Sequence, residues 1–183
     1  MDKPKPRFGR EDWIELALSL LARHGPEALT LERLTDAAKK TRGSFYHHFE
    51  DHRAFLAALG AHWLAHEIDA VIAGIDKAAL GGKRRETLAR HAADIDHALE
   101  RELRRLAASE PVIADIIAQS DEKRIAYLAR LFRSELGLDA ADALARARAQ
   151  HCFFVGAQMV FPDADARFRL ALQKTMGATL WRK

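Results

Sequence analysis

The stretch that decides the fold of this 183-residue chain is Arg42-Gly43-Ser44-Phe45-Tyr46-His47-His48-Phe49. Phe45 and Phe49 lie four residues apart, so on a helix both side chains face the same side and can enter a core. The remaining side chains then face outward and supply a guanidinium, a hydroxyl, a phenol and imidazoles. Such groups hydrogen-bond to phosphates and to base edges. The stretch therefore predicts a short helix that presents a nucleic-acid-binding face.

Two further amphipathic segments precede this stretch. The first carries an apolar stripe from Trp13 to Leu21, and Gly25-Pro26 ends it. In the second, Thr30 is a candidate N-cap for a short helix whose apolar residues include Leu34. Helices of fewer than about ten residues are not stable alone in water. We therefore expect both short helices to pack on the first one as a helix-turn-helix, whose second member enters the major groove.

The net charge of +3 says little about partners, but basic residues gather near the predicted turn. The segment 37–49 contains no acidic residue. Its basic and imidazole side chains are Lys39, Lys40, Arg42, His47 and His48. A local cluster of this kind is typical of a nucleic-acid-binding surface. The alternative is a solvated charged surface above two core aromatic residues.

The order of motifs over residues 8–60 resembles the DNA-binding domain of the TetR/AcrR family. The motifs are Thr30-Leu31-x2-Leu34-x2-Ala37-Ala38, then Gly43-Ser44-Phe45-Tyr46-His47-His48-Phe49, then Phe55-Leu56. The resemblance implies that side chains on the second short helix contact bases or phosphates, and that His48 and the start of the next helix reach the backbone. It also implies a dimeric regulator, usually a repressor, on a palindromic operator in double-stranded DNA. The predicted DNA-binding set is Lys39, Lys40, Thr41, Arg42, Gly43, Ser44, Tyr46, His47, His48 and His52.

The chain departs from the pattern of that family at the turn and at the next helix. Lys39-Lys40-Thr41 stands where the family usually has Gly-Val-Ser. Lys39 must then adopt a left-handed conformation, at a cost of about 1 kcal/mol, unless the turn is built differently. Lys40 replaces an apolar core residue, so its stem would pack in the core while its ammonium reaches solvent. His52 stands at the family's phosphate-binding lysine, and the two lysines are candidates to replace that contact.

The whole chain is predicted to form about nine helices, three short ones first, and no strand. We expect an all-α fold with a DNA-binding domain at 1-50 and a helical ligand-binding and dimerisation bundle at 51-183. Within the bundle we expect one helix at about 83–107 and a helix start at Ser120 or Asp121. A single cysteine, no uninterrupted apolar run of about 18 residues and no signal peptide indicate a cytoplasmic protein.

In the family that the chain resembles, the second half holds a small-molecule pocket and the dimer interface, and ligands tilt the fourth helix. Candidate pocket residues are aromatic, polar or soft side chains: Trp63, His66, His91, Ile95, Tyr127, Phe154 and Met159. Candidate dimer residues are apolar or small positions on the last two long helices: Phe153, Gly156, Ala157, Val160, Phe168, Leu172, Met176 and Leu180. The alternative for both sets is ordinary packing within one chain.

Three groups have spacings that occur in chemical sites: His62 with His66, His91 with Asp94 and His97, and His151 with Cys152. The first pair lacks an assigned third metal ligand, the second group lacks a nucleophile, and a buried cysteine is usually inert. We therefore predict no enzyme, no metal and no cofactor, but a regulator that responds to an unknown small-molecule effector. The alternative is a helical small-molecule-binding protein with a weakened DNA-binding head.

Overall fold

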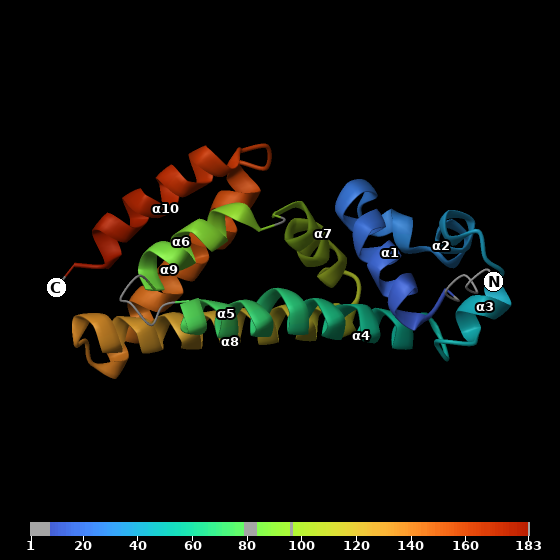
Figure 1. Ribbon diagram of the computed structural model, residues 1–183, viewed down its shortest axis with the longest axis horizontal. Coiled ribbons are helices and arrows are strands. Elements are labelled where there is room, and N and C mark those ends of the chain that lie inside the picture. The colour runs from blue at the N-terminus through green and yellow to red at the C-terminus, as the bar shows by residue number, and fades with distance from the viewer. Residues whose placement is uncertain (1–7, 79–83, 96, 183) are drawn as a thin grey trace, which may run out of the picture. The chain divides into compact units, whose positions relative to one another are not determined.

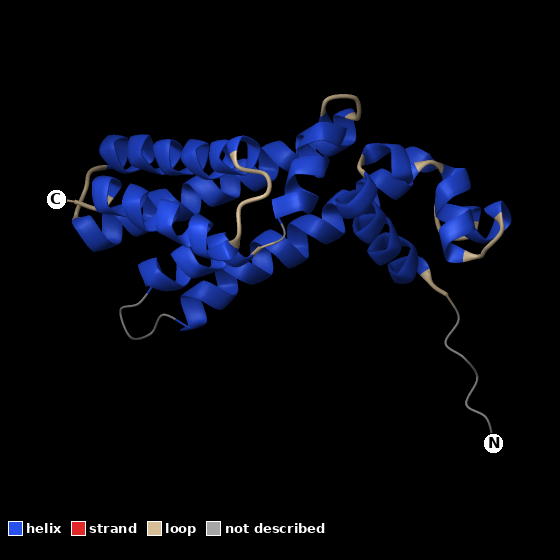
Figure 2. Cartoon of the chain, turned by 90° about the horizontal axis from the view of Figure 1, so that it is seen from above, coloured by secondary structure: helices blue, strands red, loops and turns tan. Residues whose placement is uncertain are grey.

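A computed structural model describes residues 8–78, 84–95 and 97–182. Every regular element in these residues is a helix, and Figure 2 shows helices and loops without a strand. The prediction of an all-α fold is therefore confirmed.

The chain divides into two compact units. The first consists of the residues up to Trp63 together with Ala98–Ile116, and the second of Leu64–His97 together with the residues from Ile117 onward. The boundary expected at residue 50 falls inside the first unit, because the helix after it packs against the N-terminal helix.

The N-terminal elements of the first unit are α1 (Arg10–His24), a 3-10 turn (Pro26–Leu29), α2 (Leu31–Ala38), α3 (Arg42–Tyr46) and α4 (His52–Trp63) (Figure 1). Side-chain oxygens cap three of the helices. Thr30 accepts from the Arg33 N–H at 3.4 Å, and Thr41 accepts from the Ser44 N–H at 3.2 Å. Asp51 accepts from the N–H of residue 54 at 2.6 Å. Because the first turn of a helix leaves its N–H groups without partners, these caps determine where the helices begin.

Helical backbone continues after α4 through a π-helical segment (Leu64–Asp69) into α5 (Ala70–Ala78). The remaining helices are α6 (Arg84–Asp94), α7 (His97–Ala107), α8 (Pro111–Leu136), α9 (Ala140–Val160) and α10 (Ala166–Leu180). The run His52–Lys77 is long and apolar enough to span a membrane, at a mean hydropathy of 1.2. A single helix of this kind is weak evidence, because core helices pass the same test, and Leu56, Leu59 and Ile68 are buried here.

Two helix predictions are wrong. The helix expected at about 83–107 is two helices, and His97 Nε2 lies 3.0 Å from the Ala92 carbonyl oxygen across the break. α8 runs unbroken past Ser120 and Asp121. Ser120 is fully buried, and the Asp121 carboxylate bonds to an imidazole of α9. Tertiary contacts therefore outweigh the capping preference of both residues.

The core of the second unit is built around Trp181. Its ring lies 4.2 Å from that of Phe132, and its indole N–H donates to the Gln150 side chain at 3.0 Å. Arg169 connects α10 to α6 by donating to the Ala93 carbonyl at 2.8 Å. The buried members of this core are Ile75, Tyr127, Leu128, Leu131, Phe132, Ala143, Ala147 and Trp181.

Candidate nucleic-acid interface and a cavity in the second unit

α3 is anchored in the first unit by Phe45. This side chain is 1% exposed, and its ring centroid lies 5.5 Å from that of Trp13, 5.1 Å from that of Phe49 and 5.2 Å from that of Phe55. Aromatic pairs at these distances stabilise by about 0.5–1.5 kcal/mol each beyond burial. Because α3 has only five residues, this cluster supplies stability that its own hydrogen bonds cannot.

The other side of α3 is open to solvent. Its exposed or half-buried residues are Arg42, Gly43, Ser44, Tyr46, His47 and His48. Tyr46, with 53% of its surface exposed, is a large side chain without a core position. A Cβ added at Gly43 would meet only the Thr41 hydroxyl, at 3.7 Å, so the backbone leaves room for another molecule to approach closely. These side chains, which the sequence predicts to face DNA, are thus accessible to another molecule, and their DNA contacts stay a prediction.

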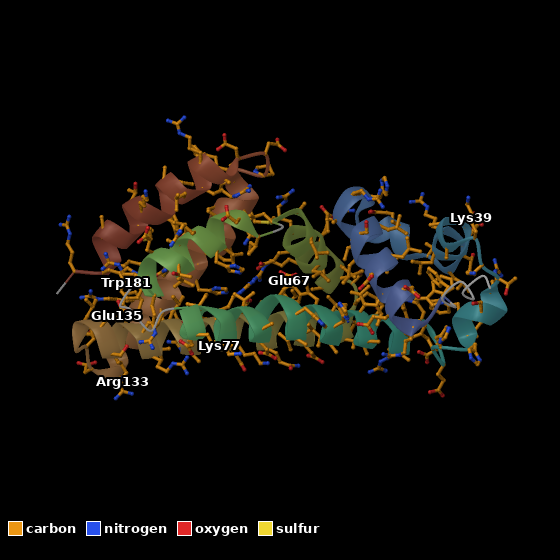
Figure 3. The ribbon with its side chains drawn as sticks, viewed as in Figure 1. Lys39, Glu67, Lys77, Arg133, Glu135 and Trp181 are labelled. Carbon is orange, nitrogen blue, oxygen red and sulfur yellow. The ribbon has the colours of Figure 1, made fainter. Side chains whose placement is uncertain are left out.

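The turn before α3 is left-handed at Lys39. Its φ and ψ are 51° and 45°, and it is the non-glycine residue with positive φ in the described part of the chain. The Lys39 N–H donates to the Asp36 carbonyl at 3.1 Å and the Lys40 N–H to the Thr35 carbonyl at 3.0 Å, which closes the end of α2. Figure 3 shows Lys39 at this end of α2. The sequence left two possibilities, a left-handed Lys39 or a turn that is built differently. The chain adopts the left-handed conformation, which is strained for lysine, and the Lys39 side chain is exposed.

Lys40 and His52 are placed differently from their expected roles. Lys40 is exposed, so its stem does not fill the core. Its ammonium lies 5.6 Å from the ring centroid of Phe8, which packs edge-on against Trp13. Nε2 of His52 lies 2.9 Å from the Leu29 carbonyl oxygen, which ties the start of α4 to the 3-10 turn. A phosphate contact by His52 stays a prediction.

The members of the histidine groups lie in different surroundings. Nδ1 of His62 lies 2.9 Å from Oε1 of Glu11, whereas His66 is exposed. His151 is buried and donates through Nε2 to the Asp121 carboxylate at 2.9 Å. The neighbouring Cys152, expected to be buried, is exposed on α9.

The second unit contains a cavity of about 390 Å³. The π-helical segment, α5, α6, α8, α9, α10 and the residue after α10 all contribute to its wall. The apolar part of the wall includes Ile68, Val71, Ile72, Ile75, Leu88, Leu128, Phe154 and Trp181. Figure 3 labels two of the lining residues, Glu67 and Trp181. Its volume lies in the range of small-molecule sites.

Four of the predicted pocket residues line this cavity: His91, Ile95, Tyr127 and Phe154. The other three do not. Trp63 belongs to the first unit and is 2% exposed, His66 is exposed, and Met159 is 59% exposed. Sequence reasoning missed Arg124, which lies one helical turn before Tyr127 and could have been found by that spacing.

Two polar side chains of the cavity, Arg124 and His151, lie against Phe154. The guanidinium of Arg124 lies 5.2 Å from the Phe154 ring centroid, and the His151 ring stacks on Phe154 at 6.2 Å. Burial, helped by the charge of Arg124, lowers the pKa of His91 below its ordinary value, so His91 is neutral at neutral pH. Burial and the neighbouring Asp76 raise the pKa of Tyr127 to about 12, and the Tyr127 hydroxyl donates to Asp76 at 3.1 Å.

The predicted dimer residues are divided between core and surface. Val160 is 67% exposed and Phe168 is 43% exposed, beside the exposed Met159 and Phe161. The rings of Phe161 and Phe168 lie 5.1 Å apart, which makes one apolar patch where α9 ends and α10 begins. Phe153, Gly156, Ala157, Leu172, Met176 and Leu180 are half-buried. Leu180 packs against the core of the second unit.

The first third of the chain matches known proteins in sequence. Residues 14–59 match the family described as bacterial regulatory proteins, tetR family. The chain is 40% identical over 55 residues to the HTH-type transcriptional repressor AcnR of Corynebacterium glutamicum, and to the AcnR of Corynebacterium efficiens. Each alignment covers 30% of this chain and 29% of the relative. The match therefore spans less than a third of the length of these curated relatives.

Solved structures resemble the chain over most of its length. A protein from Rhodococcus sp., described as a TetR-family transcriptional regulator, has a TM-score of 0.76 at 14% identity, covering 94% of this chain and 98% of that one. A protein from Pseudomonas aeruginosa PAO1, described as a transcriptional regulator, has a TM-score of 0.75 at 18% identity, covering 93% and 89%. At these identities the likeness concerns the fold.

Proposed function

We propose that the chain, whose residues 14–59 match the tetR family of bacterial regulatory proteins, is a cytoplasmic transcriptional regulator that binds double-stranded DNA as a homodimer. It acts as a repressor on a palindromic operator and leaves the DNA when a small-molecule effector binds. The repressor relatives support the sign of regulation.

The observation that carries this proposal is the outward face of α3. Arg42, Tyr46 and His47 project from a helix whose other side is fixed by Phe45. Arginine binds guanine edges or phosphates, and the hydroxyl and imidazole groups bind either. A rigid helix with these groups on one side is the geometry by which a helix-turn-helix reads the major groove.

Dimerisation is supported by the apolar patch of Met159, Val160, Phe161 and Phe168. All four residues are more than 40% exposed. Large apolar side chains that gather in one area of a surface usually mark an interaction site. A two-fold dimer would place two copies of α3 on half-sites about 34–36 Å apart. The cavity supports effector binding, and α4 and α5 belong to one helical run, so a ligand that shifts α5 acts on α4 directly.

The test is binding of the purified protein to the DNA upstream of its own gene, measured by fluorescence anisotropy at low salt. We expect saturable binding that scrambled DNA does not reproduce, and a dimer by analytical ultracentrifugation. Absence of binding to any palindromic DNA at low salt would favour the alternative, a small-molecule-binding protein with a weakened DNA-binding head. The observation that favours this alternative is the turn before α3, where Lys39 and Lys40 replace the usual residues of the family.

The lysine turn has a separate test. If Lys39 and Lys40 both contact phosphates, replacing both with alanine makes the negative slope of log K against log salt shallower by about 2, because each contact releases about one counterion. The matched control is Lys77→Ala, an exposed lysine on α5. An unchanged slope in the double variant would exclude the phosphate role.

A further inference from the structure

Gln158 on α9 is a buried polar side chain that makes no hydrogen bond. It is 3% exposed. Neither its amide oxygen nor its amide nitrogen has a hydrogen-bond partner in the part of the chain that the structure describes. A buried amide of this kind destabilises a fold, because it has lost its bonds to water and gained none in return. One donor group and one acceptor are therefore available here to another molecule.

Gln158 lines a second, small cavity of the second unit. The volume of this small cavity is about 10 Å³, which is room for about one water-sized group. Arg169 also lines it, but its guanidinium already donates to the carbonyl oxygens of Ala93 and Ala164. A hydroxyl oxygen fits a space of this size, and it can accept from the Gln158 amide nitrogen while its proton goes to the amide oxygen.

The small cavity adjoins the large one. Three residues line both cavities: Ala92, Phe154 and Gln173. Phe154 is half-buried, and its ring lies 5.8 Å from that of His97 and 6.2 Å from that of His151. Because the two cavities share part of their wall, a molecule in the large cavity can extend alongside Phe154 towards Gln158.

The charged side chains of the large cavity carry both signs: Glu67, Arg85, Glu86, Arg90, Arg124 and Lys174. Glu67 raises the pKa of His91 by more than Arg124 lowers it, so the two charges oppose each other at this ring. Glu86 lies 4.0 Å from Arg90. An ion in the cavity would meet attraction and repulsion together, and it would also lose its hydration. An uncharged molecule avoids both costs.

The remaining wall of the large cavity favours hydrocarbon. Val71, Ile72 and Leu88 belong to its apolar part, and burying apolar surface against them drives binding. Two of its polar groups already have partners, since the Tyr127 hydroxyl donates to Asp76 and the His151 imidazole to Asp121. The amide of Gln158 is therefore better placed than these two groups to bond to a polar group of the ligand.

We propose that the large cavity binds an uncharged, largely apolar molecule that carries a hydroxyl group, and that Gln158 bonds to this hydroxyl in the small cavity. The inference rests on the proposed function, because it names the class of effector that would release the DNA. A carboxylate can only accept hydrogen bonds and an ammonium can only donate them, so neither satisfies both atoms of the amide.

Isothermal titration calorimetry of the DNA-free protein tests the class with four probes of similar length: octanol, its isomer methyl heptyl ether, octanoate and octylammonium. We expect octanol to bind up to about tenfold more tightly than the ether, which has no hydroxyl proton. Both ions should bind about tenfold or more weakly than octanol, because a charged group loses its hydration in the cavity. Equal or tighter binding of the ether or of either ion would overturn the proposal, as would no binding of octanol.

The role of Gln158 is tested by Gln158→Met, which keeps the length of the side chain and removes the amide. Octanol should lose its preference over the ether, and the affinity for the ether should stay within about twofold, which shows that the cavity still folds. Gln119→Met is the matched control, because Gln119 is exposed on α8 and lines neither cavity. An unchanged preference for octanol in Gln158→Met would refute the assignment.

A parallel anisotropy measurement with operator DNA separates this inference from the proposed function. If octanol binds as expected but does not weaken the protein–DNA complex, the ligand class stands and effector-controlled release fails. If only the ions release the DNA, release stands and the ligand class is wrong.

Discussion

The face of α3 and the cavity of the second unit use the same kinds of side chain in opposite ways. In α3 the ring of Phe45 is buried, while Tyr46 and the charged and polar groups are accessible to solvent. In the cavity the aromatic and aliphatic groups line an internal space, with one half-buried guanidinium among them. The accessible residues of α3 and of the turn after it all lie between Arg42 and His48, whereas the cavity takes residues from positions 67 to 181. At α3 the buried anchoring residue and the exposed residues that we propose bind DNA are therefore different, while the residues around the cavity both pack the unit and form the wall of the proposed binding site.

The largest expected effect tests the anchoring half of α3. Phe45→Ala should lower the free energy of unfolding by about 3–5 kcal/mol, because it removes a buried ring at the centre of an aromatic cluster. Phe168→Ala is the control, a phenylalanine that is 43% exposed, and it should cost far less. Urea denaturation followed by circular dichroism measures both. Equal losses in the two variants would mean that the Phe45 cluster does not hold the unit together.

The recognition half of α3 is tested by Arg42→Ala. Binding to the specific operator should weaken by about 1–3 kcal/mol if the guanidinium bonds to a base. The unfolding transition should stay in place, because Arg42 is exposed. Anisotropy titrations against operator and scrambled DNA give the comparison. An equal loss on both DNAs would reassign Arg42 to a phosphate, and a loss of stability would show that anchoring and recognition are not separate.

At Lys39, stability and DNA binding should respond in opposite directions. Lys39→Gly should raise the free energy of unfolding by up to about 1 kcal/mol, since glycine adopts the left-handed conformation without the cost of a Cβ. The same change removes one positive charge and should make the negative slope of log K against log salt shallower by about 1. Lys39→Ala is the matched variant, which removes the charge but keeps the unfavourable φ. A stability gain in the alanine variant would indicate a different origin for the strain.

The smallest expected effect lies in the cavity and depends on pH. The pKa of His91 is lowered from its ordinary 6.5 by burial and by Arg124, while Glu67 and Asp94 oppose the shift. Because the unfolded chain binds this proton at higher pH than the folded chain, the contribution of His91 to stability is complete above pH 6.5 and declines below it. Denaturation midpoints between about pH 7.5 and 5.5 should therefore fall less in His91→Gln than in the unaltered protein. Identical pH dependence would place His91 in a more open environment than the cavity wall.

The α3 region was predictable because its information is local. Phe45 and Phe49 at helical spacing, the cap at Thr30 and the left-handed turn at Lys39 each depend on residues within a few positions. The position of Lys40 was not predictable in this way, because it depends on Phe8 lying against Trp13.

The cavity was less predictable because long-range packing determines it. His91, Ile95, Tyr127 and Phe154 line it, yet nothing in their local sequence distinguishes them from Met159, which faces solvent. The same limit applies to α8, where the buried position of Ser120 outweighs its preference for a helix start.

The exposed thiol of Cys152 makes the protein suited to spectroscopy. It is the one cysteine in the sequence, so a nitroxide can be attached there without replacing any other residue. In a symmetric pair of chains, each protomer would carry one spin, and the dipolar coupling would give a single separation across the two-fold axis. Because His151, the preceding residue, lines the cavity, the mobility of the same spin label would also report when the cavity is filled.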